Sequence, residues 1–202
     1  IDTSSILLID CGGQYLEGTT DVTRTLSFNS ASKEFKHYFT LVLKGLIALS
    51  TLKFPKGTPC CNLDVLARQF LWQEGEDYNH GTGHGVGHYL SVHEGPIRFN
   101  QTNKEPLAAG MIISIEPGLY KLNKFGIRIE NLVITKECKE HPNFLEFHSL
   151  TAVPIDIKNI DFAMLTITEK NWITSYHQTV INKLTPYLSK DELIKLKLLI
   201  EH

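Results

Sequence analysis

The sequence predicts a mixed α+β domain, and three kinds of pattern carry that prediction. Residues 6–28 alternate apolar and β-branched side chains around glycine-marked turns, as a ribbon of two strands does. Residues 35–49 and 63–71 place apolar side chains at helical spacing. Residues 111–135 return to strand-like apolar runs on both sides of a polar loop. Because no low-complexity linker divides the 202 residues, we expect one domain of ordinary size.

In the N-terminal half we expect two strands followed by two helices. Residues 6–9 are an apolar run that ends in Asp10, and residues 20–28 alternate toward a second strand. Residues 29–32 offer N-caps for a helix whose core-facing residues are Phe35, Phe39, Val42, Leu46 and Leu49. The second helix ends before Gly75, and its apolar stripe consists of Leu63, Leu66, Ala67, Phe70 and Leu71.

The C-terminal half is expected to begin with strands and to end in helices. Residues 111–115 form an apolar run, and residues 125–135 alternate like a strand. From Asp161 onward the chain is expected to be helical, and Ser189 with Glu192 has the spacing of a capping box. We therefore predict a core made of residues 1–154 and a C-terminal helical extension of the same domain made of residues 155–202.

Composition argues against several classes of protein. The net charge of −2 implies no basic face for nucleic acid and no polybasic membrane patch. No apolar run approaches the roughly 18 residues that a membrane span needs. The sequence starts without an initiator Met or a basic leader, so we expect a piece of a longer chain. The cysteines do not form a disulfide framework and fit a reducing, cytoplasmic setting; they are Cys11, Cys60, Cys61 and Cys138.

The strongest local signal lies in residues 79–96, which hold four of the nine histidines of the chain. Imidazole binds metals and transfers protons near neutral pH. The glycines between these histidines let the backbone approach a ligand closely. A histidine cluster on a glycine-rich segment is costly to order unless something holds it, so the segment predicts a metal site.

Two pairs of acidic residues reinforce that prediction. Asp10 and Asp21 lie at mirror positions about Tyr15-Leu16, so a hairpin centred there would place them opposite each other. Glu116 and Glu130 have the same relation about Asn123. Directly opposed residues have Cβ atoms about 4.5–5.5 Å apart. Two carboxylates at that distance repel each other, and burying them unpaired costs several kcal/mol each, so the pairs predict a bound cation.

The charges favour two cations over one. Four carboxylates and one neutral imidazole carry a charge of −4, which two divalent ions balance. Paired metals about 3.5–4 Å apart are commonly bridged by carboxylates and by a hydroxide nucleophile. Oxygen-rich ligation with a single nitrogen favours Mn²⁺ over a thiolate-type zinc site. The sequence leaves the choice among Mn, Co, Fe and Zn open.

Five motifs in order carry a resemblance to a known family. They are G-T-T-D-V-T-R-T (18–25), H-G-T-G-H-G-V-G (80–87), V-H-E-G-P (92–96), E-P-G (116–118) and G-I-R-I-E-N (126–131). With these motifs the chain resembles the cytosolic Xaa-Pro aminopeptidases, within the metal-dependent aminopeptidases and prolidases of the pita-bread fold. The resemblance runs from Ile6 to the C-terminal helices and implies that fold, here without its N-terminal opening segment.

The resemblance implies a role for each residue of the predicted site. The ligands of a dinuclear manganese site would be Asp10, Asp21, His84, Glu116 and Glu130, with Asp21 and Glu130 bridging both ions. His80 and His93 would contact substrate and stabilise the tetrahedral intermediate, and Glu116 would also handle the proton of the attacking water. The implied reaction uses a bridging hydroxide to release the N-terminal residue from peptides with proline second. The full-length protein is expected to be a homodimer.

One departure from the family bears on activity. Its members carry two further N-terminal domains and an opening segment of the catalytic domain, which supplies another substrate-binding histidine. We therefore expect this piece of the chain to bind metal weakly and to turn over slowly or not at all. Two alternatives stay open, a prolidase-like dipeptidase and a non-catalytic pita-bread module that binds peptides or proteins.

Several residues near the motifs receive plainer interpretations. His88 matches no ligand position and is expected to be structural. Arg128 is expected to pair with a site carboxylate instead of touching substrate. Trp172 and Tyr176 lie four apart on an expected helix, which indicates a core or subunit contact.

Overall fold

The structure, a computed structural model, describes residues 1–2, 6–89 and 91–200. Its central sheet is made of β3 (Lys53–Pro55), β4 (Gly83–Gly85), β5 (Glu94–Phe99), β6 (Ile112–Ile115), β9 (Asn131–Glu137) and β10 (Phe144–Ser149). Two ribbons are made of β1 (Ile6–Tyr15) with β2 (Gly18–Ser27), and β7 (Gly118–Lys121) with β8 (Phe125–Arg128). The helices are α1 (Lys33–Ser50), α2 (Cys60–Trp72), α3 (Ile167–Leu184) and α4 (Lys190–Ile200).

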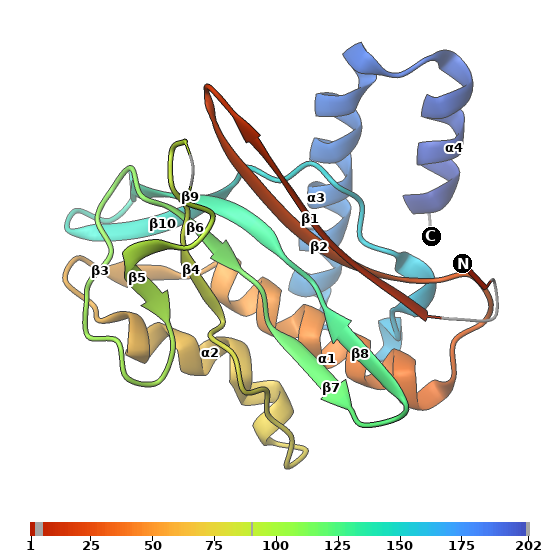
Figure 1. Ribbon diagram of the computed structural model, residues 1–202, viewed down its shortest axis with the longest axis horizontal. Helices are drawn as coiled ribbons and strands as arrows, with labels where there is room; N and C mark the ends of the chain where they lie inside the picture. Colours follow the sequence, from red (N-terminus) through yellow and green to blue (C-terminus); the bar gives the residue numbers. More distant parts are fainter. Residues whose placement is uncertain (3–5, 90, 201–202) are drawn as a thin grey trace.

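The central sheet is antiparallel, with the strand order β3-β10-β9-β6-β4-β5. Helices α1 and α2 pack together beneath it in Figure 1, and the β1-β2 ribbon runs diagonally past α3. Short 3₁₀ turns precede and follow α3; they are η1 (Ile157–Asn159), η2 (Phe162–Met164) and η3 (Thr185–Tyr187). The α+β class predicted from the sequence is confirmed. No helix in the described part of the chain is long and apolar enough to cross a membrane.

The two N-terminal helices follow the predicted patterns. The Ser32 side chain caps α1 by accepting a hydrogen bond from the Phe35 amide. All five predicted core residues of α1 are at most 1% exposed. In α2, three of the predicted stripe residues are buried; they are Leu63, Ala67 and Leu71. These helices pack against one face of the central sheet and so support the strands that carry the site.

The β1-β2 ribbon exists, but its predicted register is wrong. Asp10 pairs with Thr23, and Asp21 pairs with Gly12, so the two aspartates are not directly opposite. The turn is centred on Leu16-Glu17, one residue later than expected, because Gly12 lies inside the strand instead of in a turn. A Cβ at Gly12 would lie 2.4 Å from the Thr20 carbonyl oxygen, so glycine is needed there for close pairing. Since the offset is two residues, both aspartates still lie on the same face of the ribbon.

The pairing predicted about Asn123 is confirmed. The ribbon pairs Gly118 with Arg128, and the central sheet pairs Ile115 with Asn131 in the same register. Asn123 has φ 58°, the left-handed conformation that asparagine tolerates in a turn. Glu116 and Glu130 therefore lie opposite each other, where the long hairpin changes from one sheet to the other. The strand predicted at 125–135 is split by this break.

The C-terminal region is helical, as predicted from Asp161 onward. The capping box of α4 is present, because the Glu192 carboxylate accepts from the Ser189 amide at 2.8 Å. Leu90 of the histidine-rich segment and residues 201–202 of the C-terminal extension lie outside the described residues. The boundary expected between residues 154 and 155 stays a prediction.

Candidate metal centre

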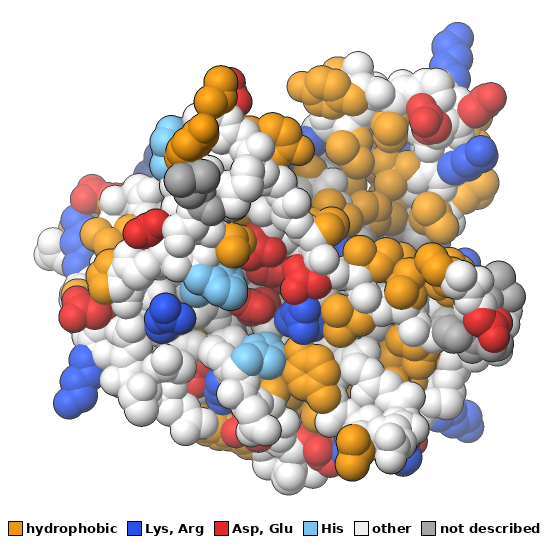
Figure 2. Space-filling view, in the orientation of Figure 1, with side chains coloured by type: hydrophobic (Ala, Val, Ile, Leu, Met, Phe, Trp, Pro, Cys, Tyr) orange, Lys and Arg blue, Asp and Glu red, His pale blue; other side chains and the backbone are white. Residues whose placement is uncertain are grey.

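The five predicted ligands lie around one cavity of about 350 Å³. They come from different parts of the fold: Asp10 from β1, Asp21 from β2, His84 from β4, Glu116 just after β6 and Glu130 just before β9. Figure 2 shows acidic side chains and histidines gathered around a hollow on this face of the molecule. His93 lines the same cavity, so the structure brings together residues up to 120 positions apart in the chain.

The glycine spacing around His84 follows from how tightly β4 is enclosed. A Cβ at Gly83 would lie 1.9 Å from the Ser114 carbonyl oxygen on β6. A Cβ at Gly85 would lie 2.4 Å from the Glu94 carbonyl oxygen on β5. Only glycine permits such close approach on both sides, and it leaves the His84 side chain as the group that β4 presents to the cavity.

His84 is the centre of the tightest cluster. One ligand atom each from Asp21, His84 and Glu130 lie within 4.8 Å of one another. The His84 Nε2 atom is 3.5 Å from an Asp21 oxygen and 3.2 Å from a Glu116 oxygen. Its Nδ1 atom lies 2.9 Å from the Gly85 carbonyl oxygen. A hydrogen bond donated there fixes the tautomer that leaves Nε2 free to bind a cation.

The pKa values of this cluster show how strongly its charges interact. Burial lowers the pKa of His84, but hydrogen bonds to Asp21 and Glu116 outweigh burial and raise the pKa to about 10. Burial and the charges of Glu116 and Asp21 together raise the pKa of Glu130 to about 8, and burial contributes most. Both raised pKa values mean that His84 and Glu130 hold protons in a site where the surrounding carboxylates need positive charge. A bound divalent cation would supply that charge instead.

One oxygen of Glu130 provides a test of whether a cation fits. Glu130 is 1% exposed, and its Oε2 atom accepts a 2.8 Å hydrogen bond from the Thr23 hydroxyl. Its Oε1 atom is buried and has no hydrogen-bond partner among the described residues. Leaving a buried carboxylate oxygen without a partner is costly. An oxygen-binding cation beside Asp21 and His84 would supply the missing partner, so the donor set fits a metal.

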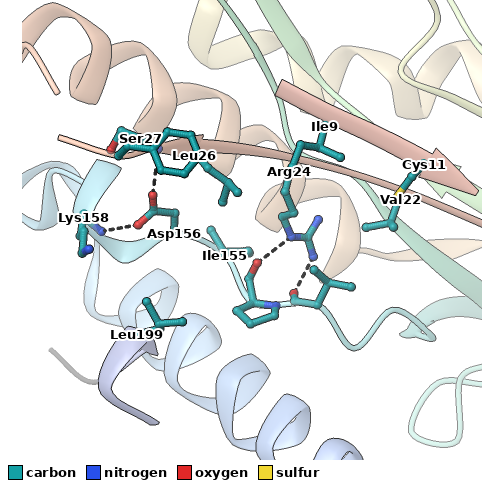
Figure 3. Close-up of a pocket in the computed structure, with 13 residues that line it drawn as sticks. Ile9, Cys11, Val22, Arg24, Leu26, Ser27, Ile155, Asp156, Lys158 and Leu199 are labelled. Atoms are coloured by element: carbon teal, nitrogen blue, oxygen red, sulfur yellow. Dashed lines mark hydrogen bonds between the residues drawn. The ribbon is translucent and has the colours of Figure 1, made fainter. Parts of the chain in front are cut away.

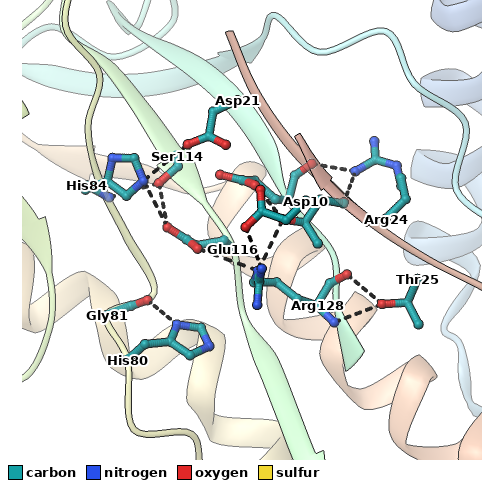
Figure 4. Close-up of polar contacts among 12 residues, drawn as sticks. Asp10, Asp21, Arg24, Thr25, His80, Gly81, His84, Ser114, Glu116 and Arg128 are labelled. Carbon is teal, nitrogen blue, oxygen red and sulfur yellow. Dashed lines mark hydrogen bonds and ion pairs between the residues drawn. The ribbon is translucent and has the colours of Figure 1, made fainter. Parts of the chain in front are cut away.

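Asp10 lies at the edge of this arrangement. Its carboxylate is 2.6 Å from the Arg128 guanidinium (Figure 4). The same guanidinium donates to the Tyr120 hydroxyl at 2.7 Å. The prediction that Arg128 pairs with a site carboxylate is confirmed. The side chain of Asp10 is 48% exposed, and it is not part of the 4.8 Å cluster. Arg128 also lies 4.0 Å from Glu116, so it faces two of the predicted ligands.

The predicted substrate histidines lie on the open side of the ligands. His80, His84 and His93 line a second cavity of about 370 Å³, together with Glu116. The rings of His84 and His93 are 4.1 Å apart between centroids. His80 bonds through Nδ1 to the Gly81 carbonyl at 2.8 Å and through Nε2 to the Tyr120 hydroxyl at 2.9 Å. Both histidines therefore line a cavity that also holds the predicted ligand Glu116, and their roles stay predictions.

His88 is exposed and lines neither cavity. The structural role expected for His88 stays a prediction. Tyr176 is 6% exposed and stacks on Trp172 with ring centroids 5.2 Å apart, so this pair is a core contact.

Four supporting residues were not found from the sequence; they are Thr23, Arg24, Arg68 and Tyr120. Thr23 and Tyr120 bond directly to predicted site residues, whereas Arg68 donates to the His80 carbonyl at 2.8 Å from helix α2. Thr23 and Arg24 lie within a motif that carried the resemblance, which was the available signal. For Arg68 no local pattern indicates the contact, because it depends on how α2 packs.

The comparisons with known proteins agree with this geometry. The profile described as "Metallopeptidase family M24" matches residues 1–137, and the "C-terminal region of peptidase_M24" matches residues 143–201. A "Probable Xaa-Pro aminopeptidase P" of Paracoccidioides brasiliensis (strain Pb03) is 50% identical over 96% of this chain and 33% of its own length. A protein of the same name from Podospora anserina is 50% identical over 100% of this chain and 31% of its own length.

Solved structures match as well. The X-prolyl aminopeptidase from Caenorhabditis elegans, described as a cytosolic enzyme with a di-nuclear active site, matches with a TM-score of 0.93 and 44% identity. The match covers 98% of this chain and 34% of that one. The dipeptidase PepE from Mycobacterium ulcerans matches with a TM-score of 0.66 and 32% identity, over 76% of this chain and 39% of that one. The chain spans about a third of the length of the curated relatives it matches.

Proposed function

Because the chain belongs to metallopeptidase family M24, we propose that it carries the catalytic site of a proline-specific aminopeptidase. The resemblance to the pita-bread peptidases, predicted from the motifs, is confirmed by the family match and by the similar solved structures. The proposed reaction releases the N-terminal residue from peptides that have proline in the second position. The names of the relatives at about 50% identity support this substrate class.

The observation that carries the proposal is the cluster of Asp21, His84 and Glu130 around an unpartnered buried carboxylate oxygen. We propose that these three residues, with Asp10 and Glu116, hold two divalent cations. When bound there, such cations would polarise the scissile carbonyl and lower the pKa of the attacking water. The oxygen-rich donor set favours Mn²⁺. The described di-nuclear site of the Caenorhabditis elegans protein supports the count of two.

The chain's own residues would handle the protons and the developing charge. Glu116 is held by the Ser114 hydroxyl, which donates to its Oε1 atom at 3.0 Å, and by its backbone amide, which donates to the Thr82 carbonyl at 2.7 Å. So positioned, Glu116 would accept the proton of the attacking water and return it to the leaving amine. His93 would donate a hydrogen bond to the oxyanion of the tetrahedral intermediate. His80, whose Nδ1–H is held by the Gly81 carbonyl, would contact the substrate and would donate through Nε2 only as an imidazolium.

We further propose a cytoplasmic location and a homodimer for the whole protein. All four cysteines are free thiols within the described structure, which fits a reducing compartment. The Caenorhabditis elegans relative is described as cytosolic. Light scattering of the purified protein tests the dimer, and a monomer at micromolar concentration would contradict it.

Hydrolysis of matched peptides by the Mn²⁺-loaded chain tests the proposed function. We expect release of the N-terminal residue from an Xaa-Pro-Xaa tripeptide, faster than from Xaa-Ala-Xaa, and loss of that release in the Glu116→Gln variant. Faster turnover of an Xaa-Pro dipeptide would instead favour the prolidase-like alternative, for which the match to a dipeptidase is the specific observation. A folded chain that binds no Mn²⁺ would contradict the proposal and favour a peptide-binding module. The expectation derived from the sequence is that this piece of the chain binds metal weakly and turns over slowly or not at all. The preference for Xaa-Pro-Xaa over Xaa-Ala-Xaa therefore tests the proposed function, and the absolute rate tests the expectation.

A further inference from the structure

Arg24 makes an unusually large set of contacts for one side chain. It is 6% exposed and points away from the cavity, on the opposite face of β2 from Thr23. Its guanidinium donates to the backbone carbonyls of Val153 and Pro154 at 2.7 and 2.9 Å (Figure 3). These carbonyls belong to the segment that leads into the C-terminal helices. Arg24 therefore ties β2 to the C-terminal region.

The same guanidinium holds the backbone of a predicted metal ligand. It donates to the carbonyl of Glu130, and at 2.7 Å to the side-chain oxygen of Asn131. The Glu130 amide in turn donates to the Thr23 carbonyl at 3.0 Å. Glu130 sits at the break between two sheets, where it lacks a regular ladder of strand hydrogen bonds. The position of Glu130 therefore depends on β2, and the hydrogen bond from Arg24 is one of the contacts that fix it.

Tyr176 of α3 completes the Arg24 contacts. Its hydroxyl accepts from Arg24 at 2.8 Å, and it lies 2.8 Å from the Val153 carbonyl oxygen and 3.2 Å from the Asn131 side chain. All three residues of this group, Arg24, Asn131 and Tyr176, are at most 6% exposed. In a buried group of this kind the loss of one partner leaves others unsatisfied, so the guanidinium is expected to move when the hydroxyl is removed.

We propose that Arg24 and Tyr176 are positioning residues through which the C-terminal region, residues 143–201, sets the place of Glu130 in the cation site. This inference rests on the proposed cation site. Tyr176 fixes the guanidinium, the guanidinium fixes the Glu130 carbonyl, and the carbonyl fixes where the Glu130 carboxylate meets Asp21 and His84. Groups that orient ligands without touching the metal commonly contribute about 10–100-fold to metal affinity.

Trp172 provides a matched control on the same helix. Its ring is stacked on that of Tyr176 with an interplanar angle of 9°, and no hydrogen bond joins it to Arg24 in the described structure. A Trp172→Phe change removes packing area beside Tyr176 but leaves the hydroxyl in place. It therefore reports how much of any effect comes from loosening α3 as a whole.

The test is the affinity of the intact chain for Mn²⁺ alone, measured by calorimetry and compared with the unfolding midpoint in urea. We expect the Tyr176→Phe variant to bind Mn²⁺ about tenfold more weakly. The Arg24→Lys variant should be at least as weak, because one ammonium cannot replace the planar guanidinium fork. The Trp172→Phe variant should lose stability and keep wild-type affinity.

Two outcomes would overturn the inference. Wild-type affinity in a folded Tyr176→Phe variant would show that the hydroxyl does not position the site. Equal losses of affinity in the Tyr176→Phe and Trp172→Phe variants, in proportion to their lost stability, would show a merely structural role. If the wild-type chain itself bound no Mn²⁺, the proposed cation site would fail, and the inference with it.

Discussion

At the scale of single residues, Glu130 shows a feature that the fold alone does not explain, a buried carboxylate that is only half satisfied within the described part of the chain. Its carboxylate is nearly inaccessible, one oxygen has a hydrogen-bond partner among the described residues and the other does not. A residue kept only for stability would not be left in that state, because an unpartnered buried oxygen weakens the fold. The unpartnered oxygen of Glu130 is therefore best explained as an atom that binds a cation.

The Glu130→Gln variant tests this explanation. The amide keeps the size of the side chain and removes the negative charge that a cation needs. Mn²⁺ affinity should therefore fall by at least about a hundredfold, the upper end of the loss when a residue that only orients a ligand is changed, while the fold persists. Calorimetric titration measures the change. Glu137→Gln is the matched control and should bind as the wild type does. Glu137 ends the strand that follows Glu130, is exposed, and is paired only with Lys56 among the described residues. Unchanged affinity in the Glu130 variant would remove this residue from the site.

His177 makes a separate prediction about stability and pH. It is 4% exposed and accepts a hydrogen bond from the Ile155 amide, while burial and the nearby charge of Arg24 lower its pKa from 6.5 to about 4. Between these pH values the unfolded chain binds a proton that the folded chain does not. Stability therefore falls as the pH falls from 6.5 toward 4, by about 2 kcal/mol at pH 5.

Urea unfolding of wild type and His177→Gln at pH 7 and pH 5 measures this difference. Glutamine keeps an acceptor for the Ile155 amide and does not titrate, so the variant should lose about 2 kcal/mol less than the wild type over that interval. Equal losses in the two proteins would contradict the assigned cause.

The site residues that could be predicted from the sequence are those whose side chains are rare in their local sequence context. Acids beside apolar strands, such as Asp21 and Glu116, and histidines between glycines, such as His84, are conspicuous in a single sequence. Tyr120 could not be predicted, because hydroxyl groups are common in strands and nothing local shows which one meets an imidazole. Thr23 lies within a motif of the resemblance, but nothing local shows that its hydroxyl meets the Glu130 carboxylate.

At the scale of elements, register separates what was predictable from what was not. The hairpin about Asn123 was placed correctly, because a polar loop and a left-handed residue mark its turn. The hairpin about Leu16-Glu17 was misplaced by one residue at its centre, since glycines inside β1 look like turn residues. The short strands β3 and β10 pair at one edge of the sheet, and this long-range pairing leaves no periodic signal in so few residues.

The contact between α1 and α2 gives a prediction at this scale. Gly45 lies where the helices cross, and a Cβ there would be 2.3 Å from the Ala67 carbonyl oxygen. Gly45→Ala should gain about 1 kcal/mol of helix propensity but force the helices apart, for a net loss of about 2 kcal/mol in unfolding free energy.

Denaturant unfolding measures this change, with Lys33→Ala at the exposed start of α1 as the control for a substitution that meets no neighbour. A Gly45→Ala variant more stable than the wild type would mean that α2 can shift freely, contrary to the close crossing described.

At the scale of the whole molecule, the site is assembled from segments spread over residues 10–130 of the chain. Strands β1 and β2 supply two ligands, β4 supplies the imidazole, and the long hairpin of β6 to β9 supplies two more. The mutual repulsion of the acids opposes this assembly, so a cation that binds the folded chain must stabilise it. Mn²⁺ at a hundred times its dissociation constant should add about 2.7 kcal/mol of stability per site.

Thermal unfolding with added Mn²⁺, and after its removal with a chelator, tests that coupling. We expect the midpoint to rise with Mn²⁺ concentration and to return when the chelator is added. The Glu130→Gln variant should show a much smaller rise. A midpoint that does not respond to Mn²⁺ would mean that the acids are tolerated in the fold for another reason.

The central claim is that five side chains from distant parts of the chain gather around two divalent cations, and crystals soaked in Mn²⁺ test it most directly. An anomalous difference map should show two peaks about 3.5–4 Å apart. The peaks should lie among Asp10, Asp21, His84, Glu116 and Glu130. A map from a well-ordered crystal with no peak in this cavity, or with Mn²⁺ bound only at other acidic positions, would contradict the claim.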